Sequence, residues 1–405
     1  FSKMSGKLNI PKSVKSIGEY AFSGCSSFNG DLIIPDQVRI IGYYAFSGCS
    51  GLKGSLNIGN SIKEIKTNTF FGCSGFQGEL ILGENIEKIE REAFKDFSKM
   101  SGKLNIPKSV KSIGNYAFYG CSKLTSSLRI PNGITSINDY SFSKCSGFTE
   151  LIIPNSVIYI YSHAFSECSG FQGSLNIPES VTYICDHAFN MCNGFNGSLI
   201  MKNNLINIGD FAFSGCTKFT SYLKIPDTVK TIGQKAFNEC YNFIGNLIIP
   251  DNVEKIGDSA FSGCSGFSTK LQIGNSFTKI KSSTFSGLSS FSGELIIGNH
   301  VERIEDNAFY KFSCLYGELK IPNSVVFIGQ YAFYKCKGFV GSLIIPDKVT
   351  KIGDYAFKGC TNLNGSLTIG NSLEVIETNT FNGCYGFQEC LTIGKKVNII
   401  KEYAF

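Results

Sequence analysis

The chain repeats one pattern of hydrophobic and polar positions at a fixed interval of twenty-four residues, the separation of Leu8 and Leu32. A leucine recurs at this interval, with a single step that is one residue shorter, between Leu128 and Leu151. An isoleucine lies nine residues after each of these leucines, and a phenylalanine lies fourteen residues after it. The seventeen leucines that begin the units are Leu8, Leu32, Leu56, Leu80, Leu104, Leu128, Leu151, Leu175, Leu199, Leu223, Leu247, Leu271, Leu295, Leu319, Leu343, Leu367 and Leu391. A fixed period of this length predicts a repeat architecture instead of several globular domains.

Inside the unit, the pattern predicts a short strand followed by turns. The alternation L-x-I places both apolar side chains on one side of a strand. V-x-x-I and A-F-x-x-C then have spacings that suit a turn or a short helical coil with one inward face. All 10 prolines lie three residues after the leucine, and because proline lacks a backbone donor, the strand ends there. We expect a β-rich solenoid of the leucine-rich type with short helical turns and seventeen rungs, one for each unit, in which every rung buries its apolar residues against the next.

A second period covers four units. The position three residues after the leucine carries pairs of Pro and then pairs of Gly, with one irregular set, which divides the chain into about 8–103, 104–222, 223–318 and 319–405. Segments 1–18 and 97–114 both read FSKMSGKLNIPKSVKSIG, which indicates recent duplication or selection for one surface. We expect one continuous solenoid over residues 1–405, uncapped at both ends because neither end shows an atypical polar unit.

The overall composition is that of the repeating unit. The chain holds 35 Phe, 44 Gly and no Trp, and its 38 basic against 32 acidic residues give a formal net charge of +6. The excess is spread along the chain without a run of Lys and Arg, so we expect no nucleic-acid partner. No long apolar stretch occurs, so we expect no membrane-spanning segment.

Most of the 16 cysteines occupy one position, seventeen residues after the leucine. Because Phe97 takes that position in another unit, we interpret it as an apolar core site holding reduced thiols, with disulfides between adjacent rungs as the open alternative. His163 and His187 lie in a column rich in tyrosine, on neighbouring rungs, and we expect their rings to stack. Four residues resemble a metal cluster: Cys185, Asp186, His187 and Cys192. Since His187 belongs to the tyrosine column, we expect no metal and no cofactor.

The position one residue after each leucine points out of the strand, away from the core. In much of the chain it alternates between isoleucine and polar residues. We interpret these isoleucines as a candidate partner-binding ladder, with the alternative that β-branched residues simply suit strands. The ladder residues are Ile33, Ile81, Ile152, Ile200, Ile248, Ile296 and Ile344.

The unit L-x-I-P-x-S-V-x-x-I-G-x-x-A-F-x-G-C-S-x-L resembles the BspA-type leucine-rich repeat over the whole chain. Two copies that carry the resemblance are LNIPKSVKSIGEYAFSGCSSF (8–28) and LIIPDKVTKIGDYAFKGCTNL (343–363). The resemblance implies a leucine-rich-repeat solenoid of a kind found on the surfaces of bacteria and of parasitic protists such as trichomonads. Members are associated with adhesion to host matrix proteins and to other microbes, and the family has no shared catalytic residues.

We therefore expect a cell-surface or secreted adhesion or recognition protein. Its partners would be host matrix proteins or other cell-surface proteins, bound through the solenoid face. The alternative is a structural filament or surface-coat subunit that assembles head to tail through uncapped ends. No G-x-S-x-G, P-loop or H-E-x-x-H motif occurs, so we expect no enzyme and no catalytic residues.

Overall fold

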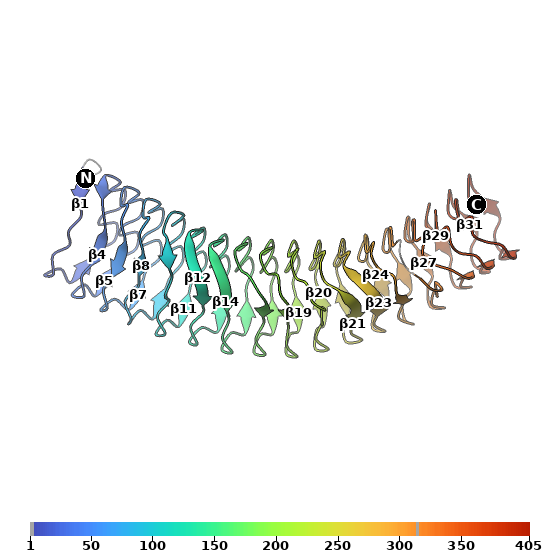
Figure 1. The fold of residues 1–405 in the computed structure, drawn as a ribbon, viewed down its shortest axis with the longest axis horizontal. Coiled ribbons are helices and arrows are strands. Elements are labelled where there is room, and N and C mark those ends of the chain that lie inside the picture. Colours follow the sequence, from blue (N-terminus) through green and yellow to red (C-terminus); the bar gives the residue numbers. More distant parts are fainter. Residues whose placement is uncertain (1–3, 313–315) are drawn as a thin grey trace. The chain divides into compact units, whose positions relative to one another are not determined.

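The chain forms a parallel β-solenoid in the computed structural model, which describes residues 4–312 and 316–405 (Figure 1). The first three residues of the duplicated segment 1–18 therefore lie outside the described residues. The chain divides into two compact units, Phe1–Gly197 and Ser198–Phe405, which we call unit 1 and unit 2 and describe separately.

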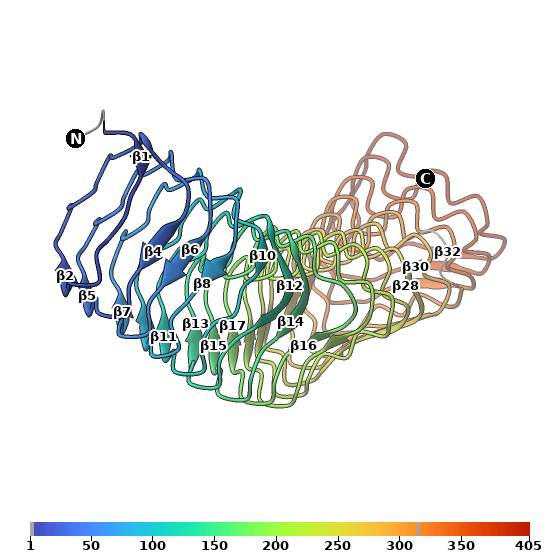
Figure 2. The same ribbon diagram turned by 60° about the vertical axis from the view of Figure 1, so that its left-hand side comes forward.

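The coils of unit 1 contribute strands to two sets that follow different edges of the stack (Figure 2). The first set, mostly on the L-x-I segments, comprises β1 (Gly6–Lys7), β3 (Phe28–Asn29), β4 (Leu32–Ile34), β6 (Leu56–Ile58), β8 (Leu80–Ile81), β10 (Gly102–Lys103), β12 (Leu124–Arg129), β14 (Phe148–Ile152) and β16 (Leu175–Asn176). The second set ends on the isoleucine nine residues after the leucine and comprises β2 (Ser16–Ile17), β5 (Ile40–Ile41), β7 (Glu64–Ile65), β9 (Lys88–Ile89), β11 (Ser112–Ile113), β13 (Ser136–Ile137), β15 (Tyr159–Ile160) and β17 (Tyr183–Ile184).

The coils of unit 2 repeat this arrangement. The first set comprises β18 (Leu199–Ile200), β21 (Gly245–Ile249), β23 (Phe267–Ile273), β25 (Glu294–Ile296), β28 (Leu343–Ile345), β30 (Leu367–Ile369) and β32 (Leu391–Thr392). The second set comprises β19 (Asn207–Ile208), β20 (Thr231–Ile232), β22 (Lys255–Ile256), β24 (Lys279–Ile280), β26 (Arg303–Ile304), β27 (Phe327–Ile328), β29 (Lys351–Ile352), β31 (Val375–Ile376) and β33 (Ile399–Ile400).

Neighbouring strands pair in parallel with a register of one sequence repeat. In unit 1, Leu32 pairs with Leu56 and Leu56 with Leu80; in unit 2, Leu343 pairs with Leu367. This register confirms that one repeat of the sequence forms one coil. The short step of the sequence also has a structural counterpart, because β12 and β14 pair one residue short of the usual offset, with Leu128 opposite Leu151.

Phenylalanine rings form the core of both units. The ring of Phe118 in unit 1 is completely buried and lies between those of Phe94 and Phe142, at centroid distances of 5.3 and 5.4 Å. In unit 2 the rings of Phe333 and Phe357 stack in the same way at 5.2 Å. A single coil would leave both faces of its phenylalanine ring exposed to water. The faces are buried only when a coil stacks on each side.

The proline position begins a β-turn, as the sequence predicts. The amide of Val38 donates to the carbonyl of Pro35 at 3.0 Å, which closes a four-residue turn. Glycine takes the same position where neighbouring coils come too close for a side chain. A Cβ atom on Gly370 would lie 2.4 Å from the carbonyl oxygen of Pro346 in the preceding coil. The alternation of Pro and Gly therefore follows the local separation of the coils.

The short helical turns expected in each rung are not helices in the described part of the chain. They are successive turns in which the tyrosine-column residue adopts a left-handed backbone, with φ of 56° at Tyr20 and 58° at Tyr116. The amide of Tyr116 donates to the carbonyl of Asp139 in the next coil at 3.0 Å. Hydrogen bonds between coils, together with three-residue turn bonds within one coil, thus take the place of the bonds four residues apart that an α-helix would need.

The cysteine column is a ladder of buried thiols. The described cysteines are free, and most of those in the column donate to a phenylalanine carbonyl of the preceding coil, as Cys145 does to Phe118 at 3.0 Å. Burial raises the pKa of Cys168 to about 12, and the carbonyl that accepts its S–H is that of Phe142. These thiols act as small core residues, in agreement with the sequence interpretation.

Candidate functional site

The outward side of the first strand set, which we call the first face, carries all seven isoleucines of the predicted ladder. Four of them are well exposed: Ile33 (57%), Ile81 (46%), Ile248 (42%) and Ile344 (60%). The other three are half-buried: Ile152, Ile200 and Ile296. The buried leucines and isoleucines on either side of each ladder residue point inward, because successive side chains of a strand alternate.

The register of the first face alternates apolar and polar residues across neighbouring coils. Ile33 pairs with Asn57, and Asn57 pairs with Ile81. Ile33 and Asn57 also line a hollow of about 520 Å³, together with Lys7, Asp31 and other residues of unit 1. A partner laid across this face would meet apolar side chains separated by hydrogen-bonding ones.

Hydrogen-bond ladders hold the edges of the first face rigid. The amide of Ser55 donates to the carboxylate of Asp31 at 2.7 Å, and the amide of Glu79 donates to the hydroxyl of Ser55 at 3.1 Å. Beyond the strands, the amide of Asn60 donates to the carboxylate of Asp36 at 2.7 Å. Because each polar side chain of one coil caps a backbone group of the next, the face has a fixed spacing and offers a preorganised surface.

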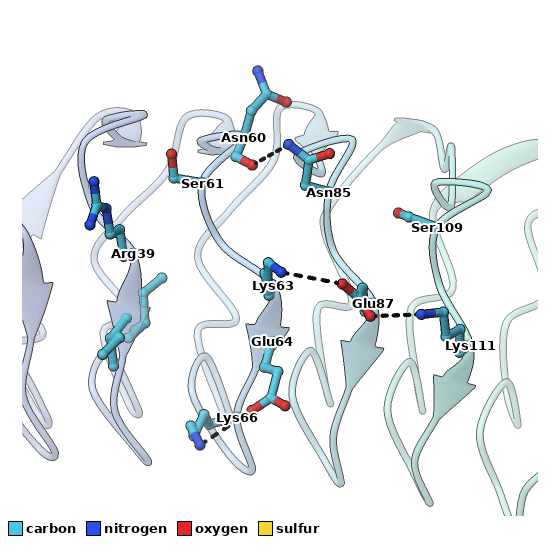
Figure 3. A pocket seen from close by; sticks show the side chains of 12 residues that line it. Arg39, Asn60, Ser61, Lys63, Glu64, Lys66, Asn85, Glu87, Ser109 and Lys111 are labelled. Atoms are coloured by element: carbon cyan, nitrogen blue, oxygen red, sulfur yellow. Dashed lines mark hydrogen bonds and ion pairs between the residues drawn. The ribbon is translucent and has the colours of Figure 1, made fainter.

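The outward side of the second strand set, the second face, was not singled out by sequence reasoning. In unit 1 it carries a groove of about 940 Å³ along neighbouring coils (Figure 3). Further along the same unit it carries exposed aromatic residues, where the ring of Tyr159 lies 5.8 Å from that of Tyr161 and 5.7 Å from that of Tyr183. The available signal was the residue seven positions after the leucine, which is basic in four of the first five units.

The tyrosine column forms a continuous stack of rings in unit 1. The ring centroids of Tyr116 and Tyr140 lie 4.5 Å apart, those of Tyr140 and His163 lie 4.3 Å apart, and those of His163 and His187 lie 4.4 Å apart, with the ring planes nearly parallel in each pair. The predicted stacking of the two histidines is therefore confirmed. Burial lowers the pKa of His163, and the charge of His187 lowers it further.

The residues that resemble a metal cluster do not converge. Cys192 is buried and donates to the carbonyl of Phe165 at 3.0 Å, whereas His187 lies in the ring stack with its Nδ1 2.9 Å from the amide nitrogen of Asn190. Among the described residues, no group of three or more His, Cys, Asp or Glu side chains is arranged to hold a metal ion. In the same residues, no helix is long and apolar enough to cross a bilayer.

Comparison with known proteins identifies the repeat. The family model described as "BspA type Leucine rich repeat region (6 copies)" matches residues 2–125, 118–242, 171–292, 206–340 and 337–405. No curated protein sequence matches the chain. Among solved structures, a leucine-rich repeat protein from Bacteroides ovatus is 26% identical with a TM-score of 0.65, and the match covers 91% of each chain.

Two further solved structures are more distant. A leucine rich cell surface protein from Faecalibacterium prausnitzii is 22% identical with a TM-score of 0.43, and the match covers 95% of this chain and 84% of the other. The pneumococcal vaccine antigen PcpA is 21% identical with a TM-score of 0.41, over 74% of this chain and 83% of the other. Because the family model matches nearly the whole sequence, and the structure has one coil for each repeat, the chain belongs to the BspA-type leucine-rich-repeat family.

Proposed function

We propose that the protein is a cell-surface or extracellular adhesion or recognition protein that binds other proteins through the first face. The observation that supports this proposal is the exposure of isoleucine side chains on short parallel sheets of the first strand set. Ile33, Ile81, Ile248 and Ile344 keep between 42% and 60% of their surface accessible to water. Covering one of them on binding is worth roughly 1 kcal/mol by the usual value for buried apolar area.

Family membership supports the same class of function. Leucine-rich-repeat solenoids generally bind proteins and are typically not catalytic, and a stack of identical coils offers a long surface for contact with a partner. Adhesion, as opposed to another kind of recognition, rests on the resemblance to surface proteins of bacteria and parasitic protists. A location at the cell surface is part of this proposal and is checked by labelling intact source cells with antibodies against the first face.

The test is a pair of variants on adjacent strands of unit 1. The double variant Ile33→Ser, Ile81→Ser removes the apolar side chains on β4 and β8, and Asn57→Ser on β6 between them is the matched control. Capture on a panel of immobilised matrix proteins should be lost in the double variant and kept in the control. Both should melt at the wild-type temperature, because the altered side chains lie on the outward side of the strands.

Unchanged capture by the double variant, or an equal loss in the control, would refute the proposal. Electron microscopy of the purified protein separates adhesion from the filament alternative. If ordered fibres form and persist in the double variant while capture is absent, end-to-end assembly replaces adhesion as the function.

A further inference from the structure

The second face of unit 1 carries a row of mostly basic side chains across neighbouring coils. The row is formed by the residue just before each strand of β2, β5, β7, β9 and β11, and its members are Lys15, Arg39, Lys63, Glu87 and Lys111. The four cations are exposed, and Glu87 is partly buried. Four cations against one carboxylate leave the row with a formal charge of +3.

Backbone hydrogen bonds between coils hold the row in register. The amide of Arg39 donates to the carbonyl of Lys15 at 2.9 Å, and that of Lys111 donates to the carbonyl of Glu87 at 2.8 Å. Adjacent positions are therefore separated by the spacing of parallel strands, about 4.8 Å, and the whole row is about 19 Å long. This spacing is close to the length of one sugar residue in a linear polysaccharide, so successive positions of the row face successive sugars.

Glu87 partly neutralises the row. Its carboxylate lies 3.7 Å from the ammonium of Lys63 and 2.8 Å from that of Lys111, in one line across three coils (Figure 3). The lysine side chains stay 74% and 69% exposed, so an external anion can still reach them. Lys15 and Arg39 form no ion pair with any described residue.

The groove beside the row has the chemistry of a carbohydrate site. Its lining includes the side-chain amides of Asn60 and Asn85 and the hydroxyls of Ser61 and Ser109. The Ser109 hydroxyl donates to backbone carbonyls and can accept from a sugar hydroxyl, whereas the Asn60 amide nitrogen and the Ser61 hydroxyl can donate to one. Ile40 is 57% exposed at the groove and offers an apolar contact for the C–H face of a sugar ring. None of the residues lining the groove is aromatic, whereas proteins that bind single-stranded nucleic acids stack the bases on aromatic rings.

The duplicated segment places the same cations at both ends of the row. Lys15 and Lys111 occupy equivalent positions in segments 1–18 and 97–114, and each is accompanied by a second exposed lysine, Lys12 or Lys108. The same lysine pair therefore occurs twice, four coils apart, with further basic residues between the two copies. Together they form an extended line of positive charge along the second face.

We propose that this groove of unit 1 and the row beside it bind a linear sulfated polysaccharide, with its sulfates facing Lys15, Arg39, Lys63 and Lys111 and its hydroxyls facing the asparagines and serines. The site uses other strands than the proposed protein-binding face and a different class of ligand. Glu87 sets the affinity, because it competes with the ligand sulfates for Lys63 and Lys111.

The experiment measures binding of a heparin-derived octasaccharide by calorimetry at several salt concentrations. Lys63→Ala and Lys111→Ala should each weaken binding by a factor of about five, the effect of one ion pair about 4 Å apart in water. Glu87→Gln should tighten binding by a similar factor. Glu302→Gln is the matched control, because Glu302 has the same position in a coil of unit 2, where its neighbours in the row are Thr278 and Val326.

Several results would overturn the proposal. One is that Glu87→Gln binds no more tightly than Glu302→Gln, and another is that the octasaccharide binds equally well after chemical desulfation. Equal affinity for a single-stranded oligonucleotide of the same charge would show a general polyanion site instead. The double variant Ile33→Ser, Ile81→Ser should leave octasaccharide binding unchanged, which separates this proposal from that of the protein-binding face.

Discussion

Truncation of one core ring tests whether the stack of phenylalanines stabilises the solenoid. Phe118→Ala removes a completely buried ring with a ring stacked on each face, at 5.3 and 5.4 Å. Phenylalanine to alanine in a core costs about 3–5 kcal/mol of unfolding free energy, and each aromatic pair adds about 0.5–1.5 kcal/mol beyond buried area. Because two pairs are lost, we expect a cost at the upper end of the first range, about 5 kcal/mol.

Urea denaturation followed by circular dichroism measures this cost. Phe118→Leu keeps most of the buried volume and should lose less than half as much stability, because only the ring contacts and a small cavity change. Tyr385→Ala is the control, since this side chain is 87% exposed and its removal should leave the unfolding free energy almost unchanged. A Phe118→Ala protein that unfolds at the same urea concentration as the Tyr385→Ala protein would refute the buried stack.

Two further predictions concern the turns. Gly42→Ala should destabilise unit 1 by about 1–3 kcal/mol, because its Cβ would lie 2.5 Å from the backbone nitrogen of Glu19; Gly18→Ala, in the same column with no atom within 4 Å, should be neutral in the same melt. Since the pKa of His163 is lowered in the folded state, its contribution to stability is present above the unfolded value of 6.5 and is lost as the pH falls. His163→Tyr, which copies Tyr140 of the preceding coil, should therefore flatten the decline of the melting temperature between pH 7 and pH 5; an unchanged decline would exclude His163 as its cause.

The candidate binding sites differ in how far the sequence predicts them. The Ile ladder follows from alternation within one strand, so the sequence alone predicts that each of its side chains points outward. Its exposure does not follow, because Ile33 is well exposed and Ile152 is half-buried although both have the same place in the unit. Neighbouring side chains decide this difference. The basic row was missed because each of its members lies a whole repeat away from the next and no local motif joins them.

The sequence by itself determined the coil, and the tertiary structure decided how the coil turns and what its surface brings together. Leucine, isoleucine and phenylalanine at a constant period leave one way to bury every apolar face, which is to stack each unit in register on an equal one. The left-handed turn at Tyr116 has no such local cause, since aromatic residues seldom adopt a positive φ; the hydrogen bond to Asp139 of the next coil selects it. In the same way, Lys63, Glu87 and Lys111 become one charged row only because stacking brings positions a whole repeat apart in the sequence to the distance between two strands.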